Sequence, residues 1–187
     1  MHTKFFSTLA GLVLAASVTF SGATAAYAQQ PKPAFEVVAQ TAAITPLSMQ
    51  FFCAQNKSQC AAGGAAQVNM TNGLMAVLKQ VNVHVNRAIT PQRDTADIWE
   101  LNPTSGDCED YVLSKRAALI SKGVSAGALR IAYTHTRRGE PHAVLVVRTS
   151  KGDYVLDNLS NSVKTLRSSG YTIRSMSGSS ANNWIAG

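Results

Sequence analysis

The chain has 187 residues, 45% of them hydrophobic and 14% charged, with 17 Lys and Arg against 10 Asp and Glu. This apolar content excludes a mainly disordered chain, the absence of a Gly-X-Y or heptad repeat excludes a fibrous one, and the length predicts a single domain. The basic residues are scattered, and no helix-turn-helix or aromatic-plus-basic motif accompanies them. We therefore expect no nucleic-acid partner and a mild preference for acidic partners.

The first 28 residues have the pattern of a secretory signal peptide. Lys4 supplies a positive charge, the run from Phe5 to Phe20 holds no charge, and Ala26-Tyr27-Ala28 matches the small-residue pattern of a cleavage site. The apolar run is short for a membrane-spanning helix, which disfavours an uncleaved anchor. We therefore expect residues 1–28 to be removed on export. Residues 29–187 would then form one periplasmic or extracellular domain that is not an integral membrane protein.

Three cysteines in an exported chain leave one without a partner. Cys53 and Cys60 lie seven residues apart, and in an oxidising compartment such a pair most simply forms a local disulfide. A metal site is disfavoured there because no His or second Cys pair lies nearby. Cys108 is then a free thiol, and composition alone favours a buried structural thiol over a reactive one, so a reactive role depends on the residues around it.

The first half of the domain predicts helices. Residues 29–50 hold three prolines and predict an extended lead-in, and residues 54–67 predict a loop. Apolar residues at helical spacing between Val68 and Ile89 predict an amphipathic helix, followed by an ordered loop over 90–107. A second helix is predicted from Asp107 to Lys122, and the glycine that follows suits a left-handed C-terminal cap.

Beyond Gly127 the apolar period changes from that of a helix to that of a strand. Residues 129–133, 143–147 and 154–156 predict three strands, and residues 171–174 predict a fourth. Helices followed by an antiparallel sheet make an α+β domain.

One cysteine, one histidine and one aspartate lie at the ends of these predicted elements. The N-terminus of a helix favours a thiolate, so the position of Cys108 predicts a lowered pKa. His142 begins the second strand and would act as the base, with His135 as the competing candidate. Asp157 ends the third strand and could orient the imidazole of His142.

The turn between the second and third strands decides whether His142 and Asp157 can meet. A two-residue loop at 149–150 would place them directly opposite, and a four-residue loop would make them diagonal neighbours. An odd loop would point them to opposite faces. Spacing alone leaves a catalytic and a structural interpretation about equal.

Several short stretches of sequence indicate a family more specifically than the spacing of Cys, His and Asp does. They resemble the bacterial transglutaminase-like cysteine peptidases over roughly residues 45–175. That resemblance implies a papain/transglutaminase-like fold with N-terminal helices packed on a small antiparallel sheet. It also implies a nucleophile, a base and an orienting carboxylate at Cys108, His142 and Asp157. The matching stretches are Gly106-Asp107-Cys108-Glu109-Asp110-Tyr111, Leu129-Arg130, His142-Ala143-Val144-Leu145 and Val155-Leu156-Asp157-Asn158-Leu159, with Val81-Asn82 and Val85-Asn86 upstream.

The best-known members of this family imply further properties. They are calcium-dependent periplasmic proteases that cut large adhesins near paired alanines, release biofilm cells and are sequestered by a membrane-bound partner. By resemblance, Asp107 and Glu109 would bind calcium, with Asp110 as a third candidate. The residues alone favour a helix capping box formed by Asp107 and Asp110 over a calcium site. Nearby carboxylates also oppose ionisation of a thiol, and a bound divalent cation would remove that opposition.

Three functions therefore stand at this point. The first is an exported cysteine peptidase that acts on a protein substrate, for which the backbone N–H of Cys108 is the expected oxyanion donor and Trp99 a weaker second. The second is acyl transfer of the transglutaminase type, leading to cross-linking or deamidation. The third is a non-catalytic module that binds the cell envelope. The intact Cys, His and Asp favour the first.

Overall fold

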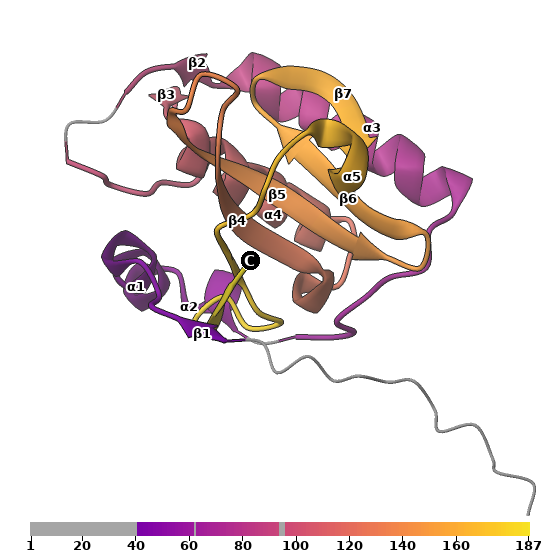
Figure 1. The fold of residues 1–187 in the computed structure, drawn as a ribbon, viewed down its shortest axis with the longest axis horizontal. Coiled ribbons are helices and arrows are strands. Elements are labelled where there is room, and N and C mark those ends of the chain that lie inside the picture. Colours follow the sequence, from indigo (N-terminus) through magenta and orange to yellow (C-terminus); the bar gives the residue numbers. More distant parts are fainter. Residues whose placement is uncertain (1–40, 62, 94–95) are drawn as a thin grey trace, which may run out of the picture. The chain divides into compact units, whose positions relative to one another are not determined.

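A computed structural model describes residues 41–61, 63–93 and 96–187 of the chain (Figure 1). The predicted signal peptide and most of the predicted extended lead-in lie outside these described residues. Among the residues that are described, no helix is both long enough and apolar enough to cross a bilayer.

Two short helices open the described chain, after strand β1 (Ala42–Ala43): α1 (Leu47–Gln55) and α2 (Lys57–Cys60). The predicted extended lead-in to residue 50 and loop over 54–67 are therefore wrong in part. Neither helix has a capping side chain at its start, and α1 is held by burial of Met49 and Phe52 in the main core, which no local pattern announces. The predicted disulfide between Cys53 and Cys60 joins the two helices.

Helix α3 (Asn72–Ala88) confirms the predicted amphipathic helix. The Thr71 side chain accepts a hydrogen bond from the backbone N–H of Leu74 at 3.0 Å and so caps the first turn. The apolar stripe buries Leu78, Val81 and Val85. After α3, the two-residue strands β2 (Thr90–Pro91) and β3 (Ser105–Gly106) pair in parallel and close the predicted loop against the start of the next helix.

Helix α4 (Cys108–Ser121) begins with the capping box that the sequence suggested. The Asp107 side chain accepts from the first turn, and the Asp110 side chain accepts from the backbone N–H of Asp107 at 3.2 Å. After the last turn Gly123 takes a φ of +83°, as predicted for the C-terminal cap. The helix is buried on most sides, because it packs against α3, the sheet and the 59–60 segment at once.

Strand β1 and the second half of the chain form a seven-stranded antiparallel sheet in the order β1-β9-β8-β4-β5-β6-β7. The three predicted strands are confirmed, each longer than its apolar run. The predicted strand at 171–174 is wrong, because the next strand begins at residue 175. The strands are β4 (Leu129–His135, after a 3-10 turn at Ala126–Ala128), β5 (Pro141–Thr149), β6 (Gly152–Asp157), β7 (Ser160–Thr165), β8 (Ser175–Ser177) and β9 (Trp184–Ala186).

The two faces of this sheet carry separate apolar clusters. Along β5, Leu145 and Val147 belong to the main core under α3 and α4, whereas Val144 and Val146 belong to a smaller cluster on the other face. That second face is covered by the short helix α5 (Leu166–Ser169) and the residues after it, as the ribbon shows (Figure 1). Helices packed on an antiparallel sheet confirm the predicted α+β class.

Helix α4 places the side chain of one lysine, Lys115, in the protein core. The Lys115 side chain is fully buried, and its Nζ has no hydrogen-bond partner among the described residues. The ammonium lies 5.6 Å from the centroid of the Tyr111 ring, within cation–π range. Burial lowers the pKa of Lys115 to about 7, against an opposing effect from the negative charge of Asp157.

This buried lysine makes stability depend on pH. Because the folded pKa lies below that of the unfolded chain, the unfolded state binds more protons between about pH 7 and pH 10.5, and stability rises with pH across that window. Lys115→Met removes the penalty, so we expect the free energy of unfolding at pH 6 to rise by about 1–4 kcal/mol. Urea titrations at pH 6 and pH 9 measure this, and a variant less stable than the wild type at pH 6 would contradict it.

Candidate active site

The β5–β6 hairpin sets the relation between His142 and Asp157. Thr149 pairs with Gly152 across a two-residue turn, and Leu145 pairs with Leu156 at the far end of the ladder. If this register is continued for three residues beyond Leu145, His142 lies opposite Leu159 and is a diagonal neighbour of Asp157, on the same face of the sheet. Of the arrangements that the sequence allowed, this is the diagonal one, because the observed turn lies one residue later than 149–150.

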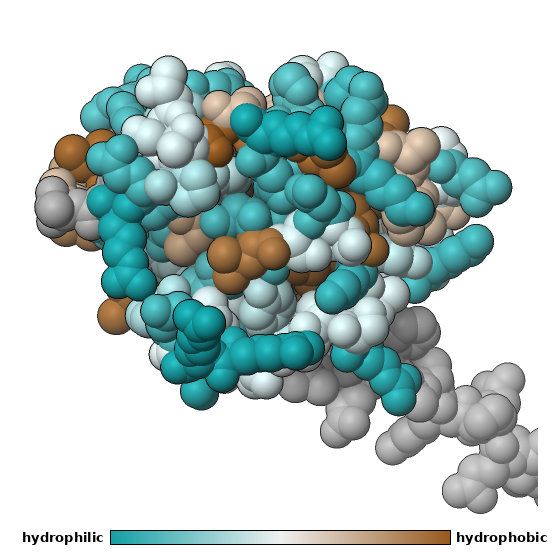
Figure 2. Space-filling model, turned by 90° about the horizontal axis from the view of Figure 1, so that it is seen from above, coloured by the Kyte–Doolittle hydropathy of each residue, from teal (hydrophilic) through white to brown (hydrophobic). Residues whose placement is uncertain are grey.

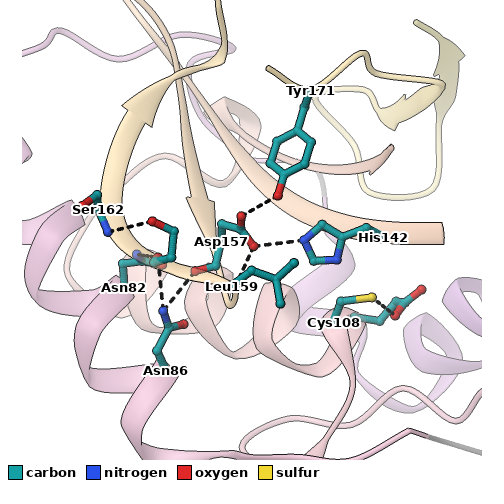
Figure 3. A network of polar contacts seen from close by, with 10 residues as sticks. Asn82, Asn86, Cys108, His142, Asp157, Leu159, Ser162 and Tyr171 are labelled. Atoms are coloured by element: carbon teal, nitrogen blue, oxygen red, sulfur yellow. Dashed lines mark hydrogen bonds and ion pairs between the residues drawn. The ribbon is translucent and has the colours of Figure 1, made fainter. Parts of the chain in front are cut away.

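The two side chains meet in a buried hydrogen bond. The Nε2 atom of His142 lies 3.0 Å from Oδ1 of Asp157, and the two residues are 4% and 6% exposed. The same carboxylate accepts the Tyr171 hydroxyl on Oδ2 at 2.6 Å and the backbone N–H of Leu159 on Oδ1 at 2.9 Å (Figure 3). Burial alone would raise the pKa of Asp157, but these hydrogen bonds outweigh burial and hold the pKa below its ordinary value. Asp157 is therefore an ionised acceptor for the imidazole.

Tyr171 and two asparagines are site residues that sequence reasoning missed. The ring of Tyr171 lies 5.7 Å from that of His142, and burial followed by the nearby Asp157 raises the pKa of its phenol, so Tyr171 stays a donor. From α3, Asn86 donates to the carbonyl of Asp157 at 3.0 Å and Asn82 to the carbonyl of Ser160 at 2.8 Å. These bonds fix the turn that follows Asp157. The only advance signal was the presence of both asparagines in the family-like stretches.

Cys108 is the first residue of α4, and its thiol donates to Oε2 of Glu109 at 2.8 Å. Burial, then the charge and hydrogen bond of Glu109, raise the pKa of this thiol well above its ordinary value. Asp107 adds to the rise, and the backbone N–H of Ala143 opposes it. The lowered pKa expected from the helix N-terminus is therefore wrong for this structure, because burial and two carboxylates outweigh the helix end.

Cys108 and His142 line the same cavity, of about 560 Å³. Figure 3 shows the imidazole between Asp157 and the cysteine, so the ring nitrogen not bound to Asp157, Nδ1, is left for the thiol. Among the described residues no hydrogen bond yet joins the sulfur to the ring, since the thiol is turned to Glu109. The competing base, His135, lines a neighbouring cavity instead.

The three acidic residues expected as metal ligands do not all lie in the same environment. Asp107 and Glu109 line the cavity beside Cys108. Asp110 is 1% exposed, and its two oxygens accept the backbone N–H groups of Glu100 at 2.7 Å and of Asp107 at 3.2 Å. Within the described ranges, no group of three His, Cys, Asp or Glu side chains is arranged to hold a metal ion. Two of the carboxylates thus belong to residues that line the cavity of Cys108, and the third holds the preceding loop to the helix.

Trp99, the weaker oxyanion candidate, is occupied elsewhere. Its indole N–H donates to Asp97 at 3.0 Å, and its ring is buried against Tyr133. The backbone N–H of Cys108 remains the candidate oxyanion donor. Gln92 lines the same cavity, so its side-chain amide is a second candidate.

Comparison with known proteins adds a family and a fold. The family model described as bacterial transglutaminase-like cysteine proteinase (BTLCP) matches residues 39–186. Calcium-bound LapG from Legionella pneumophila is similar in structure, with a TM-score of 0.54 and 23% identity over 60% of this chain and 69% of that chain. EGTA-treated LapG gives a TM-score of 0.53 and 23% identity over 61% and 68%. No curated protein matches the sequence. These findings confirm the predicted transglutaminase-like fold.

The Tyr171 hydroxyl is expected to support the His142–Asp157 pair. Tyr171→Phe removes one of the donors that lower the pKa of Asp157. Ionised Asp157 stabilises the folded protein above the pKa that this carboxyl has in the unfolded chain, and the stabilisation is lost as pH falls through its pKa in the folded protein. In the variant the folded pKa of Asp157 is higher, so the stabilisation is smaller and is lost at a higher pH. We expect the variant to lose about 0.5–1.5 kcal/mol at pH 7 and less at pH 3, measured by urea unfolding.

A matched substitution controls for loss of a hydroxyl in general. Tyr154→Phe on β6 removes a hydroxyl that makes no hydrogen bond within the described residues. Equal losses in the two variants at both pH values would contradict the role given to Tyr171.

Proposed function

The chain belongs to the bacterial transglutaminase-like cysteine proteinase family and is a cysteine peptidase, and we propose that it works through Cys108, His142 and Asp157. The observation that carries this assignment is the buried 3.0 Å contact between His142 and Asp157, facing a cavity that Cys108 also lines. Cys108 is also the free cysteine of the described chain, since the other two form the disulfide.

The geometry supports a separate role for each of the three residues. With Nε2 of His142 bound to ionised Asp157, Nδ1 is the nitrogen that takes the thiol proton. The thiolate of Cys108 attacks the peptide carbonyl, and the backbone N–H of Cys108 stabilises the oxyanion, with Gln92 as a second donor. His142 then returns the proton to the leaving amine, and water hydrolyses the acyl-enzyme. For the first step the sulfur must turn from Glu109 toward the ring.

We further propose that calcium acts at Asp107 and Glu109. Carboxylate oxygens are ligands that calcium prefers, both residues line the cavity, and their charges raise the pKa of the thiol. Bound there, calcium would supply positive charge that offsets the two carboxylates. The LapG structures, one with calcium bound and one treated with EGTA, are consistent with this assignment. Asp110, whose two oxygens accept backbone N–H groups, would hold the helix start in place.

We propose a location from the signal-peptide pattern and a substrate from the family resemblance. The signal-peptide pattern of residues 1–28 supports export of the domain over 29–187 to the periplasm. The family resemblance supports a cell-surface or periplasmic protein substrate such as a large adhesin, together with an inner-membrane partner that regulates the enzyme. Acyl transfer to an amine is the alternative reaction, because the same three residues would serve it.

A peptide-cleavage assay tests the triad. Purified protein in calcium is incubated with a proteome-derived peptide library, and mass spectrometry separates new termini from cross-linked products. We expect cuts that vanish in Cys108→Ala and fall by about 10³-fold or more in Asp157→Asn, because the amide favours the wrong tautomer of His142. Asp153→Asn, on the same strand, is the control. Cross-links without cuts would instead assign acyl transfer.

The calcium proposal has a readout that needs no substrate. EGTA should slow alkylation of Cys108 by iodoacetamide at pH 7 by about tenfold or more, because less thiolate is present. Glu109→Gln removes the largest charge that opposes ionisation, so in EGTA the variant should react faster than the wild type and should respond less to calcium, although burial of the thiol remains. Glu100→Gln, at an exposed position outside the cavity, should behave like the wild type. Wild-type and Glu109→Gln proteins that react equally slowly in EGTA would refute the proposal.

A further inference from the structure

A second cavity, of about 580 Å³, adjoins the catalytic one. It lies between the β4–β5 turn, the β6–β7 hairpin and the residues around Tyr171. Thr136, Glu140 and Leu159 line both cavities, so the two lie side by side. Asp157 lines the second cavity while its partner His142 lines the first. A peptide bound across Cys108 can therefore continue into the second cavity.

The second cavity carries positive charge without matching negative charge. Arg137, Arg138 and Lys164 line it, all three are exposed, and none forms an ion pair within the part of the chain that the structure describes. Its two acids are already engaged. Glu140 lies 3.3 Å from Arg93, and Asp157 is held by His142 and Tyr171. The fold thus gathers into one place cations that looked scattered in the sequence.

Leu159 forms the ridge between the two cavities. Its side chain is 62% exposed, while its backbone N–H is fixed to Oδ1 of Asp157 at 2.9 Å (Figure 3). An exposed leucine is held in place next to the triad and can contact an apolar group of a bound chain.

Seen from above, the molecule is mostly hydrophilic with small separate apolar patches (Figure 2).

We propose that this basic cavity is a substrate subsite, which binds aspartate or glutamate side chains of the protein substrate on one side of the bond that is cut. The inference rests on the proposed function, because the subsite is defined by its position next to the cavity of Cys108. That position favours an acidic peptide over nucleic acid or a lipid surface, since a peptide chain that enters the cavity of Cys108 can also reach the basic one.

The chemistry of the three cations suits carboxylates. Guanidinium groups bind carboxylates through two parallel hydrogen bonds, and Lys164 adds a point charge. Single exposed ion pairs contribute little, so the selectivity depends on the three acting together and weakens as salt rises.

Binding tests the subsite independently of catalysis. A tryptic peptide library from a bacterial proteome is equilibrated with Cys108→Ala protein at 150 mM salt, and bound peptides are identified by mass spectrometry. We expect acidic peptides to be enriched about five- to tenfold. Adding Arg137→Gln, Arg138→Gln and Lys164→Gln should abolish the enrichment. A control carries Lys79→Gln, Arg87→Gln and Lys122→Gln, exposed positions outside the cavity, and should keep it.

The outcomes separate the two proposals. Equal loss of enrichment in both triple variants would show only a net-charge effect and overturn the subsite, as would no enrichment at all. Binding of phosphatidylglycerol vesicles that needs the same three residues, without peptide enrichment, would assign the cavity to a lipid surface and overturn the proposal. With active protein, cuts flanked by acidic residues on one side support it. Enrichment without any Cys108-dependent cut would count against the peptidase triad and leave the acidic-peptide site standing.

Discussion

The Asp157 carboxylate is the group on which the active site depends. It is buried at the end of a strand, where an unpaired charge would be costly, and it is stabilised by an imidazole, a phenol and a backbone N–H. Each donor comes from a different segment, so the carboxylate holds β5, the β6–β7 turn and the segment after α5 in one arrangement. Asn86 of α3 then fixes the carbonyl of the same residue. The carboxylate that we propose for catalysis thus also organises the surrounding fold.

Cys108, the proposed nucleophile, is subject to opposite influences on its ionisation. The first turn of α4 favours a negative sulfur, whereas burial and the carboxylates of Glu109 and Asp107 disfavour it and dominate. The same acids serve the helix well, because acidic side chains stabilise its N-terminal end. What stabilises the start of α4 therefore suppresses the reactivity of its first residue. This conflict gives a physical basis for control of the thiol by a cation.

Local patterns predicted the elements whose apolar spacing is regular. Helices α3 and α4 and strands β4 to β6 were predicted correctly, and an even hairpin turn was enough to put His142 and Asp157 on one face. The strand Ser160–Thr165 was missed because Val163 is its one apolar residue, so the sequence shows no alternation of apolar and polar side chains. Helix α1 was missed because only tertiary packing stabilises it.

The parts of the site that could not be predicted are those made by distant segments. Tyr171 follows helix α5 and meets Asp157, 14 residues earlier in the chain, only in the folded structure. Likewise, Arg137 and Lys164 line one cavity only once the sheet is formed. Burial of Cys108 also reversed the pKa expected from its helix position. Resemblance to a family named the three central residues but said nothing of these neighbours.

The tautomer of His142 tests the account most directly. In Cys108→Ala protein with ¹⁵N-labelled histidine, NMR at neutral pH reports which ring nitrogen carries the proton. Asp157 as an ionised acceptor predicts a proton on Nε2, protected from exchange, and a bare Nδ1 facing the cavity. A proton on Nδ1, or rapid averaging of the two forms, would show that the carboxylate does not orient the ring, and the proposed catalytic arrangement would be wrong.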